Sequence, residues 1–177
     1  HKGTAWSLEH IHAQQSEGLA TEKEWRLWLN LHRKSLESID NKRYIRIIEE
    51  IDKTLAKKEI GRATFNYLSA KVVNLLTSDS SDNQYMHMLS NMALLSIDDN
   101  SALNNSTFDV KRDAIIRMDK AGDYIPVCTR NIFLKYYTPS DSCQLHFWGK
   151  PDRDGYIANM NKVLEKYLTL IQKEIKI

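Results

Sequence analysis

Side chains that could do chemistry gather near the start of the chain, where Glu9, His10 and His12 lie within one short stretch. A neutral imidazole can take a proton from water, and a carboxylate can bind a metal ion. An acid beside a histidine is common in proteins, so this pair becomes informative only together with a second polar segment. Such a segment lies at 91–112, which is rich in asparagine and ends in two basic residues.

Two apolar side chains flank the acid and the histidine. We expect Leu8 and Ile11 to anchor the segment while Glu9 and His10 project into a site. If the segment is a strand, His10 and His12 point to the same face because side chains alternate along a strand. His12 is then a phosphate contact, a residue that supports the site or a solvated side chain, and these ordinary roles together outweigh metal ligation.

The composition bounds the class of protein. With 177 residues, 42% of them hydrophobic and 27% charged, the chain has an ordinary soluble profile and is long enough for one domain with a core. No apolar run approaches the roughly 18 residues of a membrane span, and no apolar segment of a signal peptide follows residues 1–4. We expect a fragment of a longer protein, because the chemistry-bearing segment begins almost at once and no initiator Met precedes it.

The charge balance permits a nucleic-acid partner without requiring one. The net charge is +2, and a dedicated non-specific DNA-binding protein would be more basic. Two cysteines, Cys128 and Cys143, are too few for a disulfide framework or a four-cysteine zinc site. We expect both to be buried free thiols in a reducing cytoplasm.

Helical periodicity fills the stretch between the two polar segments. Apolar residues recur at helical spacing over 22–39, 42–59 and 63–76, which predicts three amphipathic helices. Since these helices separate the two polar segments, we interpret residues 21–76 as a helical insert. The residues expected on buried faces are Trp25, Trp28, Leu29, His32 and Leu36 in the first helix, Tyr44, Ile45, Ile48, Ile51 and Leu55 in the second, and Phe65, Leu68, Val72, Leu75 and Leu76 in the third.

The first of these helices begins with a recognisable cap. Thr21 and Glu24 have the spacing of a capping box, in which each side chain accepts a hydrogen bond from the other residue's backbone N–H. The two tryptophans of the first helix could stack on bases, but their place in the apolar stripe favours core packing. By the same argument His32 is a core histidine with its polar atoms satisfied, and Gly61 is expected to end the second helix.

The remaining sequence alternates short apolar runs with polar breaks. A helical turn over 85–89 precedes a strand over 92–97. Thr107 or Asp109 is expected to cap the next helix, and Gly122 to end it. The elements expected after it are an extended stretch over 124–129, a short helix over 131–137, a loop over 139–151, and a last helix over 153–175 capped by Asp152. The last helix is expected to face inward with Tyr156, Ile157, Met160, Val163, Leu164, Tyr167, Leu168 and Ile171.

The two polar segments together resemble the HNH, or ββα-metal, finger of nucleases. Residues 9–11 (EHI) stand where these nucleases have Asp or Glu, then His, then Ile or Val. Residues 91–95 (NMALL) stand where they have Asn-Leu-x-Leu-Leu. Asn100 follows at a distance that leaves room for a strand and a turn before a second ligand.

More specifically, the chain resembles the C-terminal HNH domain of GmrSD-type restriction enzymes, which are bacterial anti-phage proteins that cleave modified DNA. The chain departs from that family where Ala13 replaces a frequent proline and Ser90 a frequent glycine; Ala13 weakens the turn after the base but removes no catalytic atom. The segments that carry the resemblance are 7–14 (SLEHIHAQ), 90–96 (SNMALLS), 100–108 (NSALNNSTF), 111–112 (KR), 126–129 (PVCT) and 133–135 (FLK).

The resemblance implies a role for each polar residue. Glu9 and Asn100 would be the protein ligands of Mg²⁺ or Mn²⁺, with Asn104 as a further ligand or a neighbour that caps a helix. His10 would be the general base, and Asn91 would orient its ring. These oxygen ligands suit Mg²⁺ or Mn²⁺ better than a structural zinc ion.

Two basic residues complete the implied site. Lys111 and Arg112 would meet DNA phosphates from the helix after the site, whereas His87 and His146 receive no role. Taken singly, each residue has an ordinary explanation, since asparagine is frequent in turns and caps and paired charges usually lie on a solvated face. Taken together and in order, they favour the nuclease interpretation.

The expected fold is α+β and mainly helical, a single domain over 1–177 whose ββα-metal HNH finger is built from both sides of the helical insert. The implied function is a metal-dependent endonuclease that cleaves double-stranded foreign DNA, from phage and possibly modified, in the bacterial cytoplasm and leaves 5′-phosphate and 3′-hydroxyl ends. The resemblance also implies an N-terminal nucleotide-binding sensor domain in the whole protein, and no membrane partner is expected. Two alternatives stay open: an inactive DNA-binding or interaction module of a defence protein, and an RNA-directed nuclease.

Overall fold

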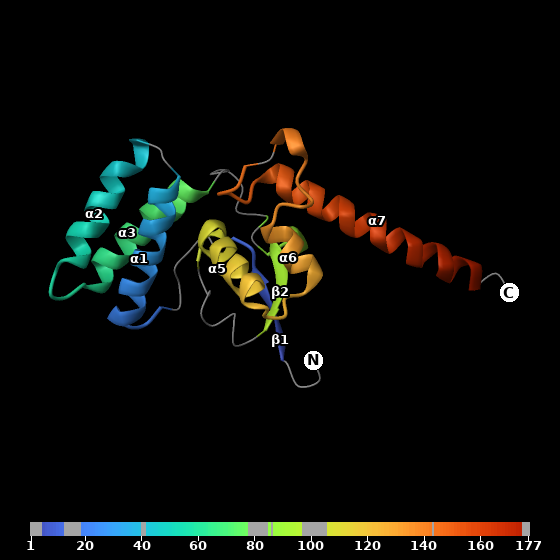
Figure 1. Cartoon of the computed structure of the whole chain (residues 1–177), viewed down its shortest axis with the longest axis horizontal. Helices are drawn as coiled ribbons and strands as arrows, with labels where there is room; N and C mark the ends of the chain where they lie inside the picture. The colour runs from blue at the N-terminus through green and yellow to red at the C-terminus, as the bar shows by residue number, and fades with distance from the viewer. Residues whose placement is uncertain are drawn as a thin grey trace.

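The computed structural model confirms that the fold is α+β and mainly helical, with 67% helix and a two-stranded sheet. The structure describes residues 5–12, 19–39, 42–77, 85, 87–96, 106–142 and 144–174. Figure 1 shows the helices of the insert grouped at one end, a central hairpin with shorter helices, and a long last helix that extends away from both. In the described part of the chain, no helix is both long and apolar enough to cross a membrane.

The helical insert folds into the three predicted helices around a core of its own. Helix α1 spans Glu22–Ser38, α2 spans Ile45–Leu55 after a 3-10 turn over Lys42–Tyr44, and α3 spans Arg62–Leu76. These helices pack side by side (Figure 1). Their shared core consists of Trp25, Trp28, Leu29, Leu36, Tyr44, Ile47, Ile51, Ile60, Phe65, Leu68, Val72, Val73 and Leu76.

The predicted capping box begins α1. The N–H of Glu24 donates to Thr21 Oγ1 at 3.3 Å, and the N–H of Thr21 donates to Glu24 Oε2 at 2.7 Å. The indole N–H of Trp25 also donates to the carbonyl of Leu19 at 3.0 Å. These bonds satisfy amides that a helix start leaves without intrahelical partners, and they fix the point where the chain enters the insert.

The second helix differs from its prediction. It ends at Leu55 instead of continuing to residue 59, and Ile47 is buried in place of Ile45, which is exposed. A 3-10 turn winds more tightly than an α-helix, so the turn before α2 shifts which residues face the core. Gly61 is the N-cap of α3 and does not end α2.

The only sheet among the described residues is a pair of antiparallel strands, β1 at Trp6–His10 and β2 at Met92–Ser96. The register runs from Trp6 opposite Ser96 to His10 opposite Met92. This confirms a strand in the region predicted for the second half of the site. Residue 97 lies outside the described residues.

Alternation along the strands decides which side chains anchor the hairpin. Ala93 and Leu95 of β2 face the interior, and Ile11 is fully buried directly after β1. The prediction that Leu8 also anchors the segment is wrong, because 61% of Leu8 is exposed. Glu9 occupies the inner face at that end of the strand, so its neighbour Leu8 must point outward.

Helices α5 (Phe108–Ala121) and α6 (Val127–Phe133) pack with the hairpin. Thr107, one of the two residues predicted to cap α5, lies at the N-cap position but makes no side-chain capping hydrogen bond, and Gly122 ends the helix in the left-handed conformation, at φ 87°. The second core of the molecule consists of Ile11, Ala93, Leu95, Phe108, Ala114, Ile115, Ile125, Ile132, Phe133, Trp148 and Tyr156.

Two predictions around α6 are wrong. The stretch over 127–129 is helical instead of extended, because Pro126 is the N-cap of a helix that ends at Phe133. A proline is tolerated at a helix start, where its missing N–H would have no intrahelical partner. Cys128 is a free thiol as expected, but it is exposed and not buried; Cys143 lies outside the described residues.

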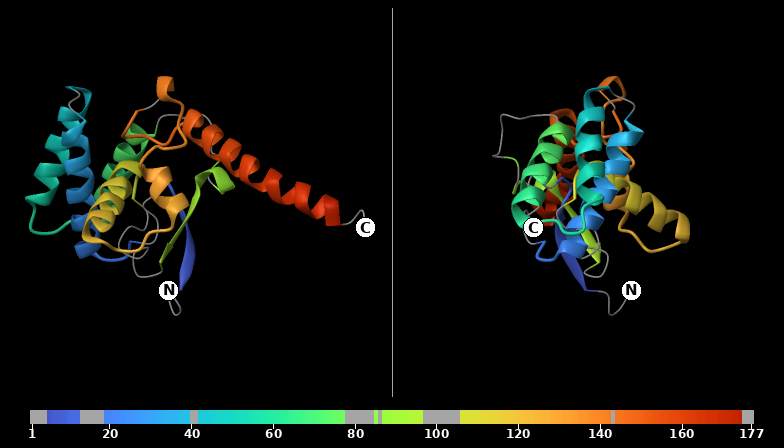
Figure 2. Two further views of the ribbon diagram at one scale, coloured as in Figure 1. Left: turned by 45° about the vertical axis from the view of Figure 1, so that its right-hand side comes forward. Right: turned by 90° about the vertical axis from the view of Figure 1, so that its left-hand side faces the viewer.

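The last helix, α7, spans Lys150–Glu174 and begins three residues before its predicted start. Asp152 serves as its cap from inside the first turn, where Oδ2 accepts the N–H of Gly149 at 2.8 Å. The second half of α7 extends away from the rest of the molecule (Figures 1 and 2). The predicted inward stripe is therefore wrong over that half, where the exposed residues include Val163, Leu164, Tyr167 and Leu168.

Polar contacts join the two cores. Ser35 Oγ donates to Asp109 Oδ2 at 2.5 Å, and the N–H of Thr107 donates to His32 Nε2 at 3.2 Å. Both contacts join α1 to the start of α5. The helical insert is thereby held against the element that carries Lys111, so the insert and the hairpin region are positioned relative to each other by buried hydrogen bonds.

Candidate functional site

The hairpin brings the two halves of the predicted site together. His10 pairs with Met92 and Glu9 with Ala93 across the antiparallel ladder. The segment that carries the acid and the histidine therefore ends beside Asn91, the last residue of a 3-10 turn that leads into β2. Pairing of the two strands thus brings together the two polar segments that the helical insert separates in the sequence.

Asn91 fixes the backbone that follows His10. Its buried side chain accepts a hydrogen bond at Oδ1 from the N–H of His12 and donates one from Nδ2 to the carbonyl of His12, both at 3.1 Å. The Asn91 carbonyl also accepts the N–H of Ile11 at 2.8 Å. A primary amide offers the same donor and acceptor as a peptide group, which suits asparagine to this place. The resemblance implies that Asn91 orients the His10 ring; these bonds instead hold the chain that leaves His10.

Glu9 and Lys111 form a buried ion pair. Lys111 Nζ lies 2.7 Å from Glu9 Oε1 and 2.5 Å from the carbonyl oxygen of His10. Burial lowers the pKa of Lys111, while the charge of Glu9 and its hydrogen bond act in the opposite direction. The prediction that Lys111 meets a DNA phosphate is wrong for this structure, because the side chain is fully buried and its ammonium is bound by Glu9 and His10.

A divalent cation on Glu9 does not fit this arrangement. The carboxylate already binds an ammonium group, and a metal ion beside it would meet that positive charge in a poorly solvated place. Among the residues that the structure describes, no three His, Cys, Asp or Glu side chains lie close enough to hold a metal ion. Asn100 and Asn104, the other expected ligands, lie outside the described residues.

His10 lies on the opposite, partly open face of β1. Desolvation is the largest cause that lowers the pKa of His10; Glu9 opposes the shift, and Lys111 and His87 add to it. A histidine with a lowered pKa is neutral at physiological pH, and the neutral ring is the form that accepts a proton. The arrangement therefore suits His10 to general-base chemistry.

His87 faces His10 from the segment before β2. Nε2 of His10 lies 3.3 Å from Nδ1 of His87, and the two rings meet edge to face with centroids 5.3 Å apart. His87 is exposed, and His10 is half-buried. No local pattern in the sequence predicts that His87 lies beside His10. The one indication is that His87 is close to Asn91 along the chain.

His12 is a structural residue that caps α5, and it does not face solvent. Nδ1 accepts the N–H of Phe108 at 3.1 Å, and Nε2 lies 3.1 Å from Oγ1 of Thr77, the C-cap of α3. Accepting at Nδ1 requires the ring proton to be on Nε2, which then donates to Thr77. Burial lowers the pKa of His12 to about 3.

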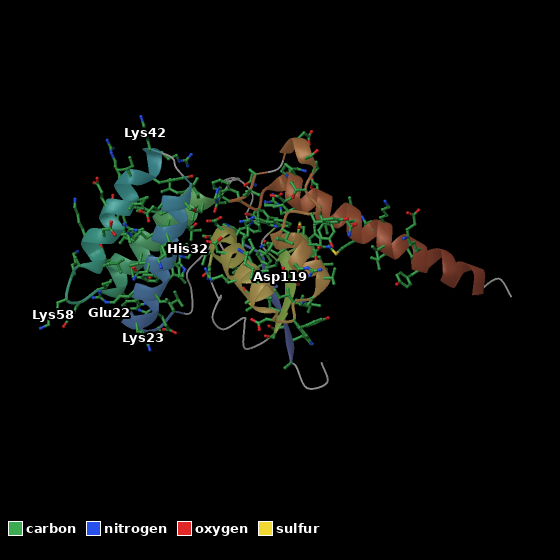
Figure 3. The ribbon with its side chains drawn as sticks, viewed as in Figure 1. Glu22, Lys23, His32, Lys42, Lys58 and Asp119 are labelled. Atoms are coloured by element: carbon green, nitrogen blue, oxygen red, sulfur yellow. The ribbon has the colours of Figure 1, made fainter. Side chains whose placement is uncertain are left out.

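His32 caps the same helix start from α1. Nε2 accepts the N–H of Thr107, and Nδ1 lies 2.9 Å from the carbonyl of Trp28, to which it donates. Figure 3 shows His32 on the side of α1 that faces α5. Burial lowers its pKa to about 3. The prediction of a satisfied core histidine is confirmed.

A further polar contact at the start of α5 was not anticipated. Asp109 is buried, and its Oδ1 lies 2.8 Å from Nδ1 of His146, while its Oδ2 accepts from Ser35. His146 comes from the loop before α7, so this contact ties that loop to α5. His146 thus has a structural role through Asp109 and does not contact His10 in the described structure.

Arg112 follows Lys111 on α5 and is half-buried. Within the described residues, its Nε is buried without a hydrogen-bond partner. No described contact assigns it a role, so binding of phosphate by Arg112 stays a prediction.

A groove of about 420 Å³ lies between the first half of α7 and the segment before β2. Its walls include Met88, Ser90, Lys150 and Arg153, together with Asp154, which forms an ion pair with Lys150. The guanidinium of Arg153 lies 3.7 Å from the centre of the Tyr85 ring. This groove therefore places basic side chains next to the segment that carries His87.

Comparisons of the chain with protein-family models, with curated proteins and with solved structures found no match.

Proposed function

We propose that the chain is an HNH-type endonuclease in which His10 is the general base. The observation that carries the proposal is the pairing of β1 with β2, which sets His10 beside Asn91 although the insert separates them in sequence. Asn91 then binds the backbone of His12, which holds the chain directly after the strand that carries the base. Helix α5 follows β2 along the chain, which is the order of a ββα finger.

The proposed chemistry is hydrolysis of a phosphodiester. The lone pair of His10 takes a proton from water while the water oxygen attacks phosphorus. The bond between phosphorus and the 3′ oxygen breaks, which leaves a 5′-phosphate and, after the leaving oxygen gains a proton from solvent, a 3′-hydroxyl. The imidazolium then returns its proton to solvent. Lys111 holds the carbonyl of His10 in place during this step.

The wider proposal follows the resemblance. The substrate is double-stranded foreign DNA, the setting is bacterial defence, and a nucleotide-binding sensor domain in the whole protein licenses cleavage. A requirement for Mg²⁺ or Mn²⁺ is also implied by the resemblance; because Glu9 binds Lys111, the ion would have to bind elsewhere than on this carboxylate. The EDTA arm of the experiment below tests the requirement.

One observation favours a second candidate, an inactive DNA-binding module. The ion pair with Lys111 occupies the carboxylate that the resemblance assigns to the metal. Such a module would bind DNA with a strong dependence on salt and would ignore EDTA. An RNA-directed nuclease shares the same residues and differs only in its substrate.

The test is nicking of supercoiled plasmid, modified and unmodified, by the full-length protein and by this chain. Each is incubated with Mg²⁺, Mn²⁺ or EDTA, and structured RNA serves as a second substrate. Replacing His10 by Ala should lower the cleavage rate by about 10²–10⁴-fold, the usual contribution of a general base. His146→Gln is the matched control, since it removes an imidazole that contacts Asp109 on another part of the fold.

The outcomes separate the candidates. Metal-dependent cutting that is lost in His10→Ala and kept in His146→Gln supports the proposal. Cutting that survives His10→Ala would reject His10 as the base. Salt-dependent binding with no cutting of DNA or RNA would favour the inactive module.

A further inference from the structure

Four of the five described histidines form two contrasting pairs, and the fifth, His146, contacts Asp109. The rings of His12 and His32 are buried, and both nitrogens of each ring are bonded to the protein. His10 and His87 instead meet each other at a partly open surface, Nε2 against Nδ1. They come from segments 77 residues apart, so this approach is a product of the fold.

The separation of these two nitrogens matches that of two ligands on one metal ion. Imidazole nitrogens bind Zn²⁺ at about 2.0–2.1 Å, so two ligands at a tetrahedral angle lie about 3.4 Å apart. Nε2 of His10 and Nδ1 of His87 lie 3.3 Å apart. In the direct contact one nitrogen must carry a proton, whereas an ion between the rings would take one lone pair from each.

We propose that His10 and His87 bind one transition-metal ion of the class that prefers imidazole, such as Zn²⁺ or Ni²⁺, and that this ion inhibits cleavage. A neutral imidazole has a single lone pair. When His10 gives that lone pair to a metal, it cannot take a proton from water. The inhibition rests on the proposed nuclease function, but binding of the ion does not.

The ligand set decides which ions the site selects. Two neutral nitrogens suit Zn²⁺, Ni²⁺ and Cu²⁺, whereas Mg²⁺ requires oxygen ligands. Glu9 cannot add a carboxylate on the same side, because it lies on the other face of β1 and binds Lys111. Water would fill the other coordination positions of the ion, so the ion would exchange readily with solvent. Inhibition that responds to the metal concentration requires such exchange.

The first experiment measures binding directly, without any reaction. Isothermal titration of the full chain with Ni²⁺ and with Zn²⁺ should show one site. His1, outside the described residues, is replaced by Ser throughout so that its imidazole does not contribute. His87→Gln and His10→Gln should each weaken binding at least tenfold, His146→Gln should change it less than twofold, and Mg²⁺ should show no heat from this site. His87 is exposed, and unchanged melting temperature confirms that its variant folds.

The second experiment tests the consequence. Zn²⁺ added to a reaction in excess Mg²⁺ should inhibit nicking at concentrations close to its measured Kd, and His87→Gln should raise the inhibiting concentration at least tenfold. Equal affinity in His87→Gln and its parent would overturn the metal site. Intact binding with no effect of Zn²⁺ on cleavage would overturn the inhibition. If no substrate is cut at all, the nuclease proposal and the inhibition fail together, while the titration still decides the site.

Discussion

Lys111 Nζ lies 2.7 Å from Glu9 Oε1, so a fully buried ammonium on α5 neutralises the carboxylate on the inner face of β1. The same ammonium bonds to the carbonyl of His10. One side chain thus ties α5 to the residue proposed as the base. Glu9 therefore takes part in the contact between β1 and α5, while His10 faces the open side of β1.

Replacing Lys111 by Met should destabilise the chain by about 3–5 kcal/mol, because it leaves a buried carboxylate without its partner. The double variant with Glu9→Gln should recover part of that loss. Urea unfolding of the single and double variants measures both effects. Lys150→Met is the matched control, since its ion pair with Asp154 is exposed and should contribute about 1 kcal/mol or less. Equal losses at Lys111 and Lys150 would contradict a buried, structural ion pair.

Replacing Asn91 by Ala should free the backbone of His12. Two buried hydrogen bonds are lost, and buried groups left without partners cost about 1–3 kcal/mol each. Amide hydrogen exchange at His12 should speed up by more than tenfold, whereas exchange in the middle of α3 should change only as far as global stability falls. Unchanged protection at His12 would show that the amide of Asn91 does not hold this segment.

Stability should fall as the pH drops from about 6.5 toward 3. His12 and His32 have pKa values lowered to about 3 in the folded chain, from the ordinary histidine value of 6.5. Between pH 6.5 and 3 the unfolded chain therefore binds protons that the folded chain does not bind. The contribution of these histidines to stability is fully present only above this pH range. Each histidine contributes a slope of roughly 1 kcal/mol per pH unit. Unfolding by urea between pH 7 and 4 measures it, and His32→Gln should show a shallower slope than the parent chain. Parallel curves would contradict the neutral, buried state of His32.

The outer half of α7 should contribute little to stability. Leu164→Glu and Leu168→Glu replace exposed residues and should change the free energy of unfolding by about 0.5 kcal/mol or less. Tyr156→Ala, about two to three turns earlier, should cost about 3 kcal/mol, because Tyr156 is buried and stacks on Tyr137. Thermal unfolding of the three variants compares them. A large loss at Leu164 or Leu168 would mean that the outer half of α7 is covered in solution.

Gly155→Ala should destabilise the chain even though alanine is normally the better helix former by about 0.5–1 kcal/mol. A Cβ at Gly155 would collide with the backbone carbonyl oxygen of Tyr137. The helix must then shift away from that carbonyl, at a cost of about 1–3 kcal/mol. Ala158→Gly is the control, because it tests a helix position on the same element without this contact. A melting temperature that rises in Gly155→Ala would contradict the close approach.

Much of the fold followed from local patterns. The capping box of Thr21 and Glu24 and the stripe from Trp25 to Leu36 need only contacts within one helix, and both appear as predicted. The strand that begins at Met92 and the helix capped by Thr107 were also recognisable. Local patterns gave a wrong prediction where burial depends on neighbouring elements. The apolar stripe on the outer half of α7 has the periodicity of a buried face, yet among the described residues no element covers it.

The sequence by itself determined where α1, α3, α5 and β2 lie and which polar residues are candidates for chemistry, because caps, periodicity and polar motifs act over a few residues. Only the tertiary structure decided what those residues touch. Alternation along β1 puts Glu9 and His10 on opposite faces. Packing of α5 against β1 then pairs Glu9 with Lys111, and pairing of β1 with β2 brings His10 to His87. These contacts depend on partners from distant segments, on desolvation and on strand register. The residues next to His10 in the sequence do not reveal any of the three.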